Sequence, residues 1–213
     1  GQLVEPALVG FDEDGAPPIL TQVANGTDEP RVLFSSRAVP ALVDPPGVSH
    51  PATLTMNGRT VGWVLPAGTD LPEGVSVLEP ETSPPPFPPI ELPGKILETP
   101  WELMLGNGNQ IRSDVAELFD ESRFTLADGV HYSGTEKISL EPAAHLEAGV
   151  HLDVTQGPIR IEDGVRISAF TRLVGPVFIG RDTQILGGTI RNASVGPICR
   201  VKGEVQNSVL LGY

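Results

Sequence analysis

Aliphatic residues recur at about every sixth position from residue 140 to the end of the chain. Two slips interrupt this series, which comprises Leu140, Leu146, Leu152, Ile161, Ile167, Leu173, Ile179, Ile185, Val195 and Val201. A small or β-branched residue follows most of them four positions later, namely Ala144, Val150, Val165, Thr171, Val177, Thr183, Thr189, Cys199 and Val205. A six-residue period suits neither an α-helix nor an ordinary two-sided sheet, but it suits a solenoid of short strands. We therefore predict a triangular β-solenoid over residues 125–213, with both series pointing inward.

Gly and Asp residues occupy the turns that such a solenoid needs. They lie at Glu162–Gly164, Gly180–Asp182 and Gly187–Gly188, where the backbone is expected to adopt φ > 0. The two slips contain Thr155–Pro158 and Arg191–Ser194. Insertions leave the stack of a solenoid at a corner, and in many repeat proteins they line a binding face. The sequence leaves open whether these two segments are surface bulges or binding loops.

The residues before the solenoid have a different pattern. Residues 1–80 are mixed and contain strand-like runs at 31–34, 52–56, 60–65 and 75–78. The pair Asn57-Gly58 separates two of these runs and predicts a hairpin turn. Residues 81–98 include the proline-rich stretch Pro84–Pro93, which we interpret as a stiff, extended connector, the alternative being a ligand for proline-recognising domains.

A helix is predicted over residues 99–120. Thr99 can cap it, Pro100 suits the first helical position, and Glu102 can complete a capping box. Gly106–Asn109 interrupts the helical pattern, so one kinked helix and two short helices remain open. The apolar positions recur at helical spacing and predict a packing face that seats the helix between two domains: Trp101, Met104, Leu105, Ile111, Val115, Leu118 and Phe119.

Composition narrows the environment and the partners. The formal net charge of −13 argues against nucleic acid and anionic membranes as ligands, because phosphate binding requires clustered Lys and Arg. No apolar run reaches the length of a membrane span. The single cysteine, Cys199, excludes an internal disulfide and is typical of a reducing, cytoplasmic compartment. Because it falls at an inward position of the repeat, we interpret it as a small core residue.

Several runs resemble a known family. Val177–Asp182 and Val195–Val205 resemble hexapeptide-repeat proteins with a left-handed parallel β-helix. Thr99–Leu103 with Ile111–Asp114, and Val201–Tyr213, are similar to segments of the bacterial UDP-N-acetylglucosamine pyrophosphorylase/glucosamine-1-phosphate acetyltransferase family, in its divergent sugar nucleotidyltransferase branch. The resemblance covers roughly residues 96–213 and is weak over residues 1–95.

The resemblance implies an architecture and an activity. Residues 1–80 would be the C-terminal part of a truncated α/β nucleotidyltransferase-like domain, 99–120 a linker helix and 125–213 a left-handed β-helix. The implied reaction joins a nucleoside triphosphate and a sugar 1-phosphate with Mg²⁺, and the β-helix would add acyl-CoA-dependent acyl transfer and form a homotrimer. Because the chain starts at Gly1 and stops at Tyr213 within a repeat, we expect a fragment that is inactive alone.

Two other classes of function stay open at this point. One is a non-catalytic trimerisation scaffold that carries a degenerate nucleotidyltransferase domain. The other is an acyltransferase without nucleotidyl transfer. The sequence identifies neither the sugar, the nucleotide nor the acyl donor.

Few residues qualify as site residues. Asn57-Gly58-Arg59 resembles an Asn-Gly-Arg element of this branch, so Asn57 and Arg59 are the substrate-binding candidates. A plain hairpin turn with an exposed arginine is the simpler explanation of the same residues. His145 and His151 are six residues apart and therefore belong to successive faces of the solenoid, which predicts exposed corner histidines rather than a metal or acid–base pair. No metal ligand and no catalytic residue is assigned.

Overall fold

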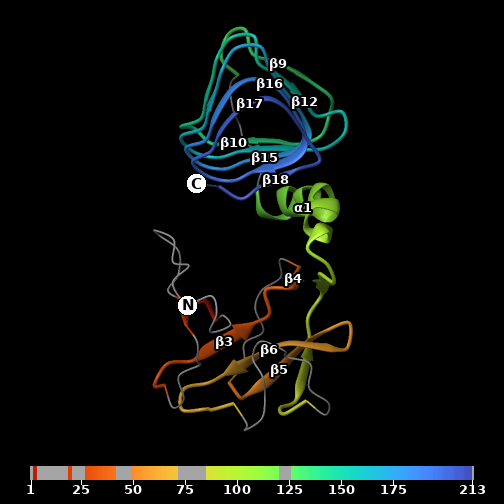
Figure 1. Ribbon diagram of the computed structural model, residues 1–213, viewed down its shortest axis with the longest axis vertical. Coiled ribbons are helices and arrows are strands. Elements are labelled where there is room, and N and C mark those ends of the chain that lie inside the picture. Colours follow the sequence, from red (N-terminus) through yellow and green to blue (C-terminus); the bar gives the residue numbers. More distant parts are fainter. Residues whose placement is uncertain are drawn as a thin grey trace. The chain divides into compact units, whose positions relative to one another are not determined.

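The computed structural model describes residues 2–3, 19–20, 27–41, 49–71, 85–119 and 126–212. The chain divides into two compact units, Gly1–Glu98 and Thr99–Tyr213 (Figure 1). We describe each unit by itself.

The first unit contains a four-stranded sheet in the order β3-β6-β5-β7. β6 pairs antiparallel with both β3 and β5, and β7 pairs parallel with β5. Two further pairs, β4 with β8 and β1 with β2, lie outside this sheet. The bounds are β1 (Gln2–Leu3), β2 (Ile19–Leu20), β3 (Arg31–Phe34), β4 (Ala38–Pro40), β5 (Ala52–Met56), β6 (Arg59–Leu65), β7 (Pro89–Glu91) and β8 (Gly94–Ile96).

Three of the four strands expected before residue 80 are confirmed as β3, β5 and β6, and the fourth, at 75–78, lies outside the described residues. The hairpin is confirmed as well, because Asn57 and Gly58 have φ of 53° and 73° between β5 and β6. Leu54, Met56 and Val61 form the core of this unit. Its described residues include strands but no helix, so the nucleotidyltransferase-like domain stays a prediction.

The proline-rich region joins this unit instead of standing free as a connector. It supplies β7 to the four-stranded sheet and is followed by β8, which pairs with β4. Two backbone hydrogen bonds join this region to β5. The N–H of Thr53 donates to the carbonyl oxygen of Pro88, and the N–H of Leu92 donates to that of Thr55. Extended proline-rich backbone is suited to an edge strand, where a missing N–H removes no ladder hydrogen bond.

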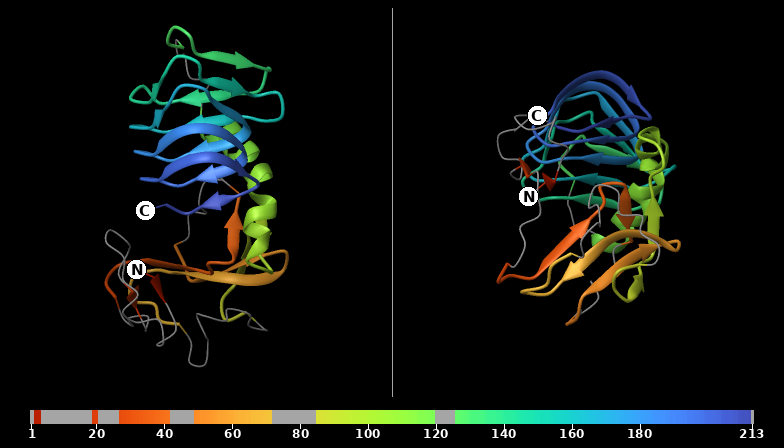
Figure 2. Two further views of the ribbon diagram at one scale, coloured as in Figure 1. Left: turned by 45° about the horizontal axis from the view of Figure 1, so that its top comes forward. Right: turned by 60° about the horizontal axis from the view of Figure 1, so that its bottom comes forward.

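The second unit is a parallel β-solenoid of about four turns, preceded by one helix. Every pairing between its strands is parallel. Figure 1 looks along the stack and shows the triangular coils, and the left view of Figure 2 shows them as layers beside the helix. The strands are β9 (His131–Ser133), β10 (Ile138–Leu140), β11 (His145–Leu146), β12 (His151–Asp153), β13 (Ile159–Ile161), β14 (Arg166–Ile167), β15 (Thr171–Ile179), β16 (Gln184–Val195), β17 (Arg200–Gln206) and β18 (Val209–Leu210).

Each coil has three faces. In the first two coils, β9 and β12 pair on the first face, β10 and β13 on the second, and β11 and β14 on the third. β15, β16 and β17 are longer because each continues around at least one corner. β18 ends the second face.

The predicted aliphatic ladder is confirmed as the solenoid core. Of the ten residues in the six-residue series, nine are buried and Leu140 packs against them partly buried. The prediction that Thr189 points inward is wrong. Thr189 pairs in register with Arg172 and Glu204 on the outside of the coil, and Ile190 takes the inward position. The reason is the Gly187-Gly188 pair, where the ladder shifts register between Ile185 and Gly188.

The expected helix forms as α1, Trp101–Leu118, without a break at Gly106–Asn109. It lies against β15 and β16 on the second face (Figure 1). The predicted capping box is wrong, because Pro100 is the N-cap and makes no side-chain cap hydrogen bond. Thr99 Oγ1 is buried and has no hydrogen-bond partner within the described part of the chain. The packing face is also narrower than predicted. Its buried residues are Gly108, Ile111 and Val115, whereas Trp101, Met104, Leu105 and Leu118 are exposed.

Candidate functional site

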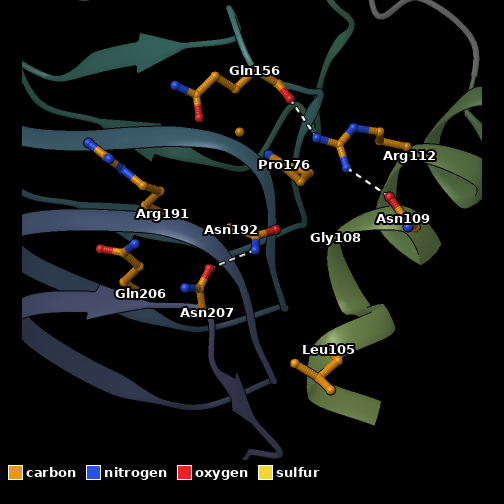
Figure 3. Close-up of a pocket in the computed structure, with 11 residues that line it drawn as sticks. Leu105, Gly108, Asn109, Arg112, Gln156, Pro176, Arg191, Asn192, Gln206 and Asn207 are labelled. Carbon is orange, nitrogen blue, oxygen red and sulfur yellow. Dashed lines mark hydrogen bonds between the residues drawn. The ribbon is translucent and has the colours of Figure 1, made fainter. Parts of the chain in front are cut away.

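A polar pocket lies where the first and second faces of the solenoid meet beside α1. We call it the corner pocket, and its volume is 310 Å³ (Figure 3). Its lining residues are Leu105, Gly108, Asn109, Arg112, Gln156, Gly175, Pro176, Arg191, Asn192, Gln206 and Asn207. Both slips of the sequence repeat therefore contribute to one pocket.

Two asparagines shape the corner on the solenoid side. Asn192 and Asn207 have φ of 46° and 50°, in the left-handed region that Asn tolerates better than most residues. This conformation turns the chain from the first face to the second. Asn192 Nδ2 donates to Asn207 Oδ1 at 2.7 Å, which joins successive coils (Figure 3). The slip at Arg191–Ser194 is thus a bend within β16 and not an inserted loop.

The helix side of the pocket depends on a close approach at Gly108. A Cβ atom there would overlap Asn192 Oδ1, so a larger residue would push the helix away from the corner. Arg112 Nη2 donates to the carbonyl oxygen of Gln156 at 2.8 Å, and its Nη1 donates to Asn109 Oδ1 at 3.2 Å. Gly108 and Arg112 together hold α1 against this corner.

The lining is cationic and rich in amides. It contains two arginines, five residues with side-chain amides and no carboxylate. Figure 3 shows Arg112 beside Gln156 and Arg191 extending away from α1, so the guanidinium groups lie on opposite sides of the corner. Guanidinium groups recognise phosphate and carboxylate oxygens, and amides donate to and accept from hydroxyls. Because the lining also has no His, Cys or Ser, it offers binding groups but neither a nucleophile nor a general base.

The two substrate-binding candidates from the sequence lie elsewhere, in the β5–β6 hairpin of the first unit. The Glu91 carboxylate accepts hydrogen bonds from Thr55 Oγ1 at 2.6 Å and from the backbone N–H of Gly58 at 3.4 Å. The Thr55 hydrogen bond lowers the pKa of Glu91, with smaller contributions from the backbone N–H groups of Gly58 and Asn57. Arg59 Nη1 donates to the Glu98 carboxylate. These contacts fasten the turn, and substrate binding by Asn57 and Arg59 stays a prediction.

His145 and His151 lie on different faces, as expected from their spacing. They belong to β11 and β12, so they project from strands and not from corners, which corrects the predicted position. His145 is exposed as predicted, whereas His151 is half-buried. His151 Nε2 lies 3.0 Å from Ser133 Oγ. Among the residues that the structure describes, no three His, Cys, Asp or Glu side chains are placed to hold a metal ion. Cys199 is half-buried and packs against the core, as predicted.

Sequence reasoning located the slips but missed Gly108 and Arg112. The signal was the Gly-Asn-Gly-Asn run at 106–109, which looked like a helix interruption. Its actual role is to bring a glycine and a short amide side chain against the solenoid. Arg112, one helical turn later, is exposed and polar, so the apolar periodicity of the helix does not single it out.

Comparison with protein families, with curated proteins and with solved structures finds no significant match to this chain. Within the described ranges, no helix combines the length and the apolar character needed to cross a bilayer. The fold itself defines the class of the second unit, which is a parallel β-solenoid with a helix packed on one face.

Proposed function

We propose that the protein is a sugar-phosphate transferase of the hexapeptide-repeat class, with a left-handed coil. The proposal rests on the resemblance over residues 96–213 and on the order of a single helix followed by a parallel six-residue solenoid. In the proposed reaction, an oxygen of a sugar 1-phosphate attacks the α-phosphorus of a nucleoside triphosphate, a new P–O bond forms and diphosphate leaves. Acyl transfer from acyl-CoA is the further activity that the resemblance assigns to the solenoid.

The observation that carries the proposal is the lining of the corner pocket. A chain with a formal net charge of −13 presents two guanidinium groups and five amides there without any carboxylate. Such a site suits a ligand with a phosphate at one end and hydroxyls at the other, because charge-assisted bonds to guanidinium are the strongest contacts that a phosphate makes. A sugar 1-phosphate has this chemistry.

Mg²⁺, the cofactor implied for nucleotidyl transfer, neutralises triphosphate charge when it is bound. The described residues provide no group of three metal-ligating side chains, so they do not fit a protein-held ion. We assign no residue to Mg²⁺ and derive no step through it. The residues that we assign have a binding role, with Arg191 facing the phosphate and Asn192, Asn207 and Gln206 facing the hydroxyls. Arg112 holds α1 at the corner through the Gln156 carbonyl oxygen.

Isothermal titration calorimetry of this chain with glucose 1-phosphate tests the proposal. We expect binding that Arg191→Gln weakens about tenfold, since a charge-assisted hydrogen bond contributes about 1.5 kcal/mol. Arg200→Gln is the matched control, because Arg200 is an outward-facing, exposed strand residue on the third face. No detectable binding, or an equal loss in the control variant, would contradict the assignment.

A non-catalytic scaffold is the second candidate, favoured by the absence of a nucleophile and a general base from the corner pocket lining. In this role the β-helix would hold three copies together. Multi-angle light scattering of the protein, combined with an assay of diphosphate release from nucleoside triphosphate and sugar 1-phosphate, separates the two. A trimer without turnover supports the scaffold, and turnover supports the transferase.

A further inference from the structure

A second cavity lies between α1 and the second face of the solenoid, apart from the corner pocket. We call it the helix cavity. Its volume is 360 Å³, which falls within the range of small-molecule sites of about 300–1,000 Å³. Its lining residues are Asn107, Gln110, Ile111, Asp114, Val115, Leu118, Phe119, Glu162, Phe178 and Ser194. The cavity is open to solvent, since Leu118 in its lining is 55% exposed, so a small molecule can enter it.

The walls of the helix cavity are apolar and partly aromatic. Five of its ten lining residues are apolar, and two of these, Phe119 and Phe178, are phenylalanines. Phe178 belongs to β15 and pairs in register with Ser194 of β16, whereas Phe119 follows the end of α1. The two rings therefore come from the two elements that enclose the space. A flat or aliphatic body fits such walls.

Asn107 ties the helix wall of the cavity to the solenoid. Its Oδ1 accepts a hydrogen bond from Ser194 Oγ at 2.8 Å. This contact fixes α1 relative to the strand that carries Ser194.

The charge of the lining is negative. Asp114 accepts a hydrogen bond from Gln110 Nε2 at 2.7 Å, and Glu162 accepts one from the backbone N–H of Arg181 at 3.2 Å. The lining includes no Lys or Arg, and neither carboxylate forms an ion pair within the described part of the chain. Two cations contact Phe119 from outside the lining. The Arg160 guanidinium lies over the Phe119 ring and is paired with Glu141, and Lys137 Nζ donates to the Phe119 carbonyl oxygen.

We propose that the helix cavity binds a small organic ammonium ion with an apolar body. The body lies between the Phe119 and Phe178 rings, and the ammonium group lies near Asp114 and Glu162. Two carboxylates attract a single positive charge, and the Phe178 ring adds cation–π attraction. The Phe119 ring already carries the Arg160 guanidinium, so it serves as an apolar wall. This inference is independent of the proposed sugar-phosphate site, which has the opposite charge and lies at the corner.

The test is an NMR titration of ¹⁵N-labelled protein with benzylamine, whose ammonium group is charged at pH 7. We expect shifts of the α1 amides and nuclear Overhauser contacts between the probe and the two phenylalanine rings. Benzyl alcohol, the uncharged analogue, should bind about tenfold more weakly, as should benzylamine to Glu162→Gln, because a charge-assisted contact is lost in each case. Asp114→Asn provides a second variant should Glu162→Gln fail to fold.

The control variant is Glu147→Gln. Glu147 also accepts a backbone N–H bond, from Ala169 at 2.8 Å, but it lies outside the cavity lining. This variant should bind benzylamine as the unchanged chain does. Equal affinity for benzylamine and benzyl alcohol, equal loss in Glu147→Gln, or unchanged α1 amides would each overturn the proposal.

Discussion

Asp153 joins two neighbouring coils on the first face of the solenoid. Its carboxylate accepts hydrogen bonds from Thr155 Oγ1 at 2.6 Å and from Arg172 Nη2 at 2.5 Å. Asp153 itself is only 5% exposed. The Thr155 hydroxyl, followed by Arg172, holds the pKa of this carboxyl well below its ordinary value. The ionised form is therefore the one that stabilises the fold.

Replacement of Asp153 by Asn tests this contribution. At pH 7 we expect the free energy of unfolding to fall by about 1.5 kcal/mol, since a charge-assisted contact is lost. Because the pKa is lower in the folded state, this advantage of the carboxylate is fully present above about pH 4 and is lost progressively as the pH falls toward the lowered folded-state pKa. Urea denaturation at pH 7 and at about pH 2 measures it. The exposed Asp163→Asn is the control, and a difference of equal size at both pH values would contradict the account.

Some residues could be placed from the sequence and others could not. Leu152, Ile167 and Ile185 are wholly apolar and fall on the six-residue period, so the period alone predicted their burial. Asn192 did not follow from it, because a left-handed asparagine and an exposed strand residue have the same sequence signature. The pocket-forming residues are of this second kind.

The helix α1 is held to the solenoid by a few specific contacts. Ser194 Oγ donates to Asn107 Oδ1, Arg112 donates to the Gln156 carbonyl, and Gly108 permits the close approach. Sequence periodicity predicted the helix and its two buried aliphatic residues, Ile111 and Val115. It could not predict which apolar residues stay exposed, because that depends on the surface against which the helix packs.

Substitution of Ser194 by Ala should loosen α1 selectively. The change leaves both polar atoms of the Asn107 side chain without partners, which costs about 1 kcal/mol. Hydrogen exchange measured by mass spectrometry should then show about fivefold lower protection in α1 and unchanged protection in β13 and β16. Ser168→Ala, a half-buried serine of the third-face corner, serves as the control. Uniform loss of protection throughout the second unit would refute a local role.

At the scale of the whole second unit, the coils become shorter toward the C-terminus. Leu152, Leu173, Ile190 and Val205 are successive register partners, and fewer residues separate each pair along the chain. The shortening takes place mainly at the corner that carries the pocket, where Thr155–Pro158 is followed by the tighter turns at Gly175-Pro176 and Asn192. A corner whose turns differ in length leaves space on its outer side, and α1 and the amide side chains border that space.

The fold of the second unit was therefore readable from the sequence and its pocket was not. A repeated core demands a repeated pattern, and residues 140–201 have one. A pocket arises where the repeat fails, at positions that share no pattern. For the first unit, alternation predicted three strands, but pairing between segments as distant as β5 and β7 left no local signal.

In-register parallel stacking is the central claim, and cysteine cross-linking tests it most directly. In a Cys199→Ala background, Arg166→Cys with Gln184→Cys places thiols on register partners of the third face, about 4.8 Å apart between strands. Arg166→Cys with Arg200→Cys places them two coils apart, at about 9.6 Å. Disulfides require Cα atoms within about 7 Å. The account predicts an intramolecular disulfide, detected by mass spectrometry after oxidation, in the first pair and none in the second. Cross-linking of the second pair but not of the first would contradict it.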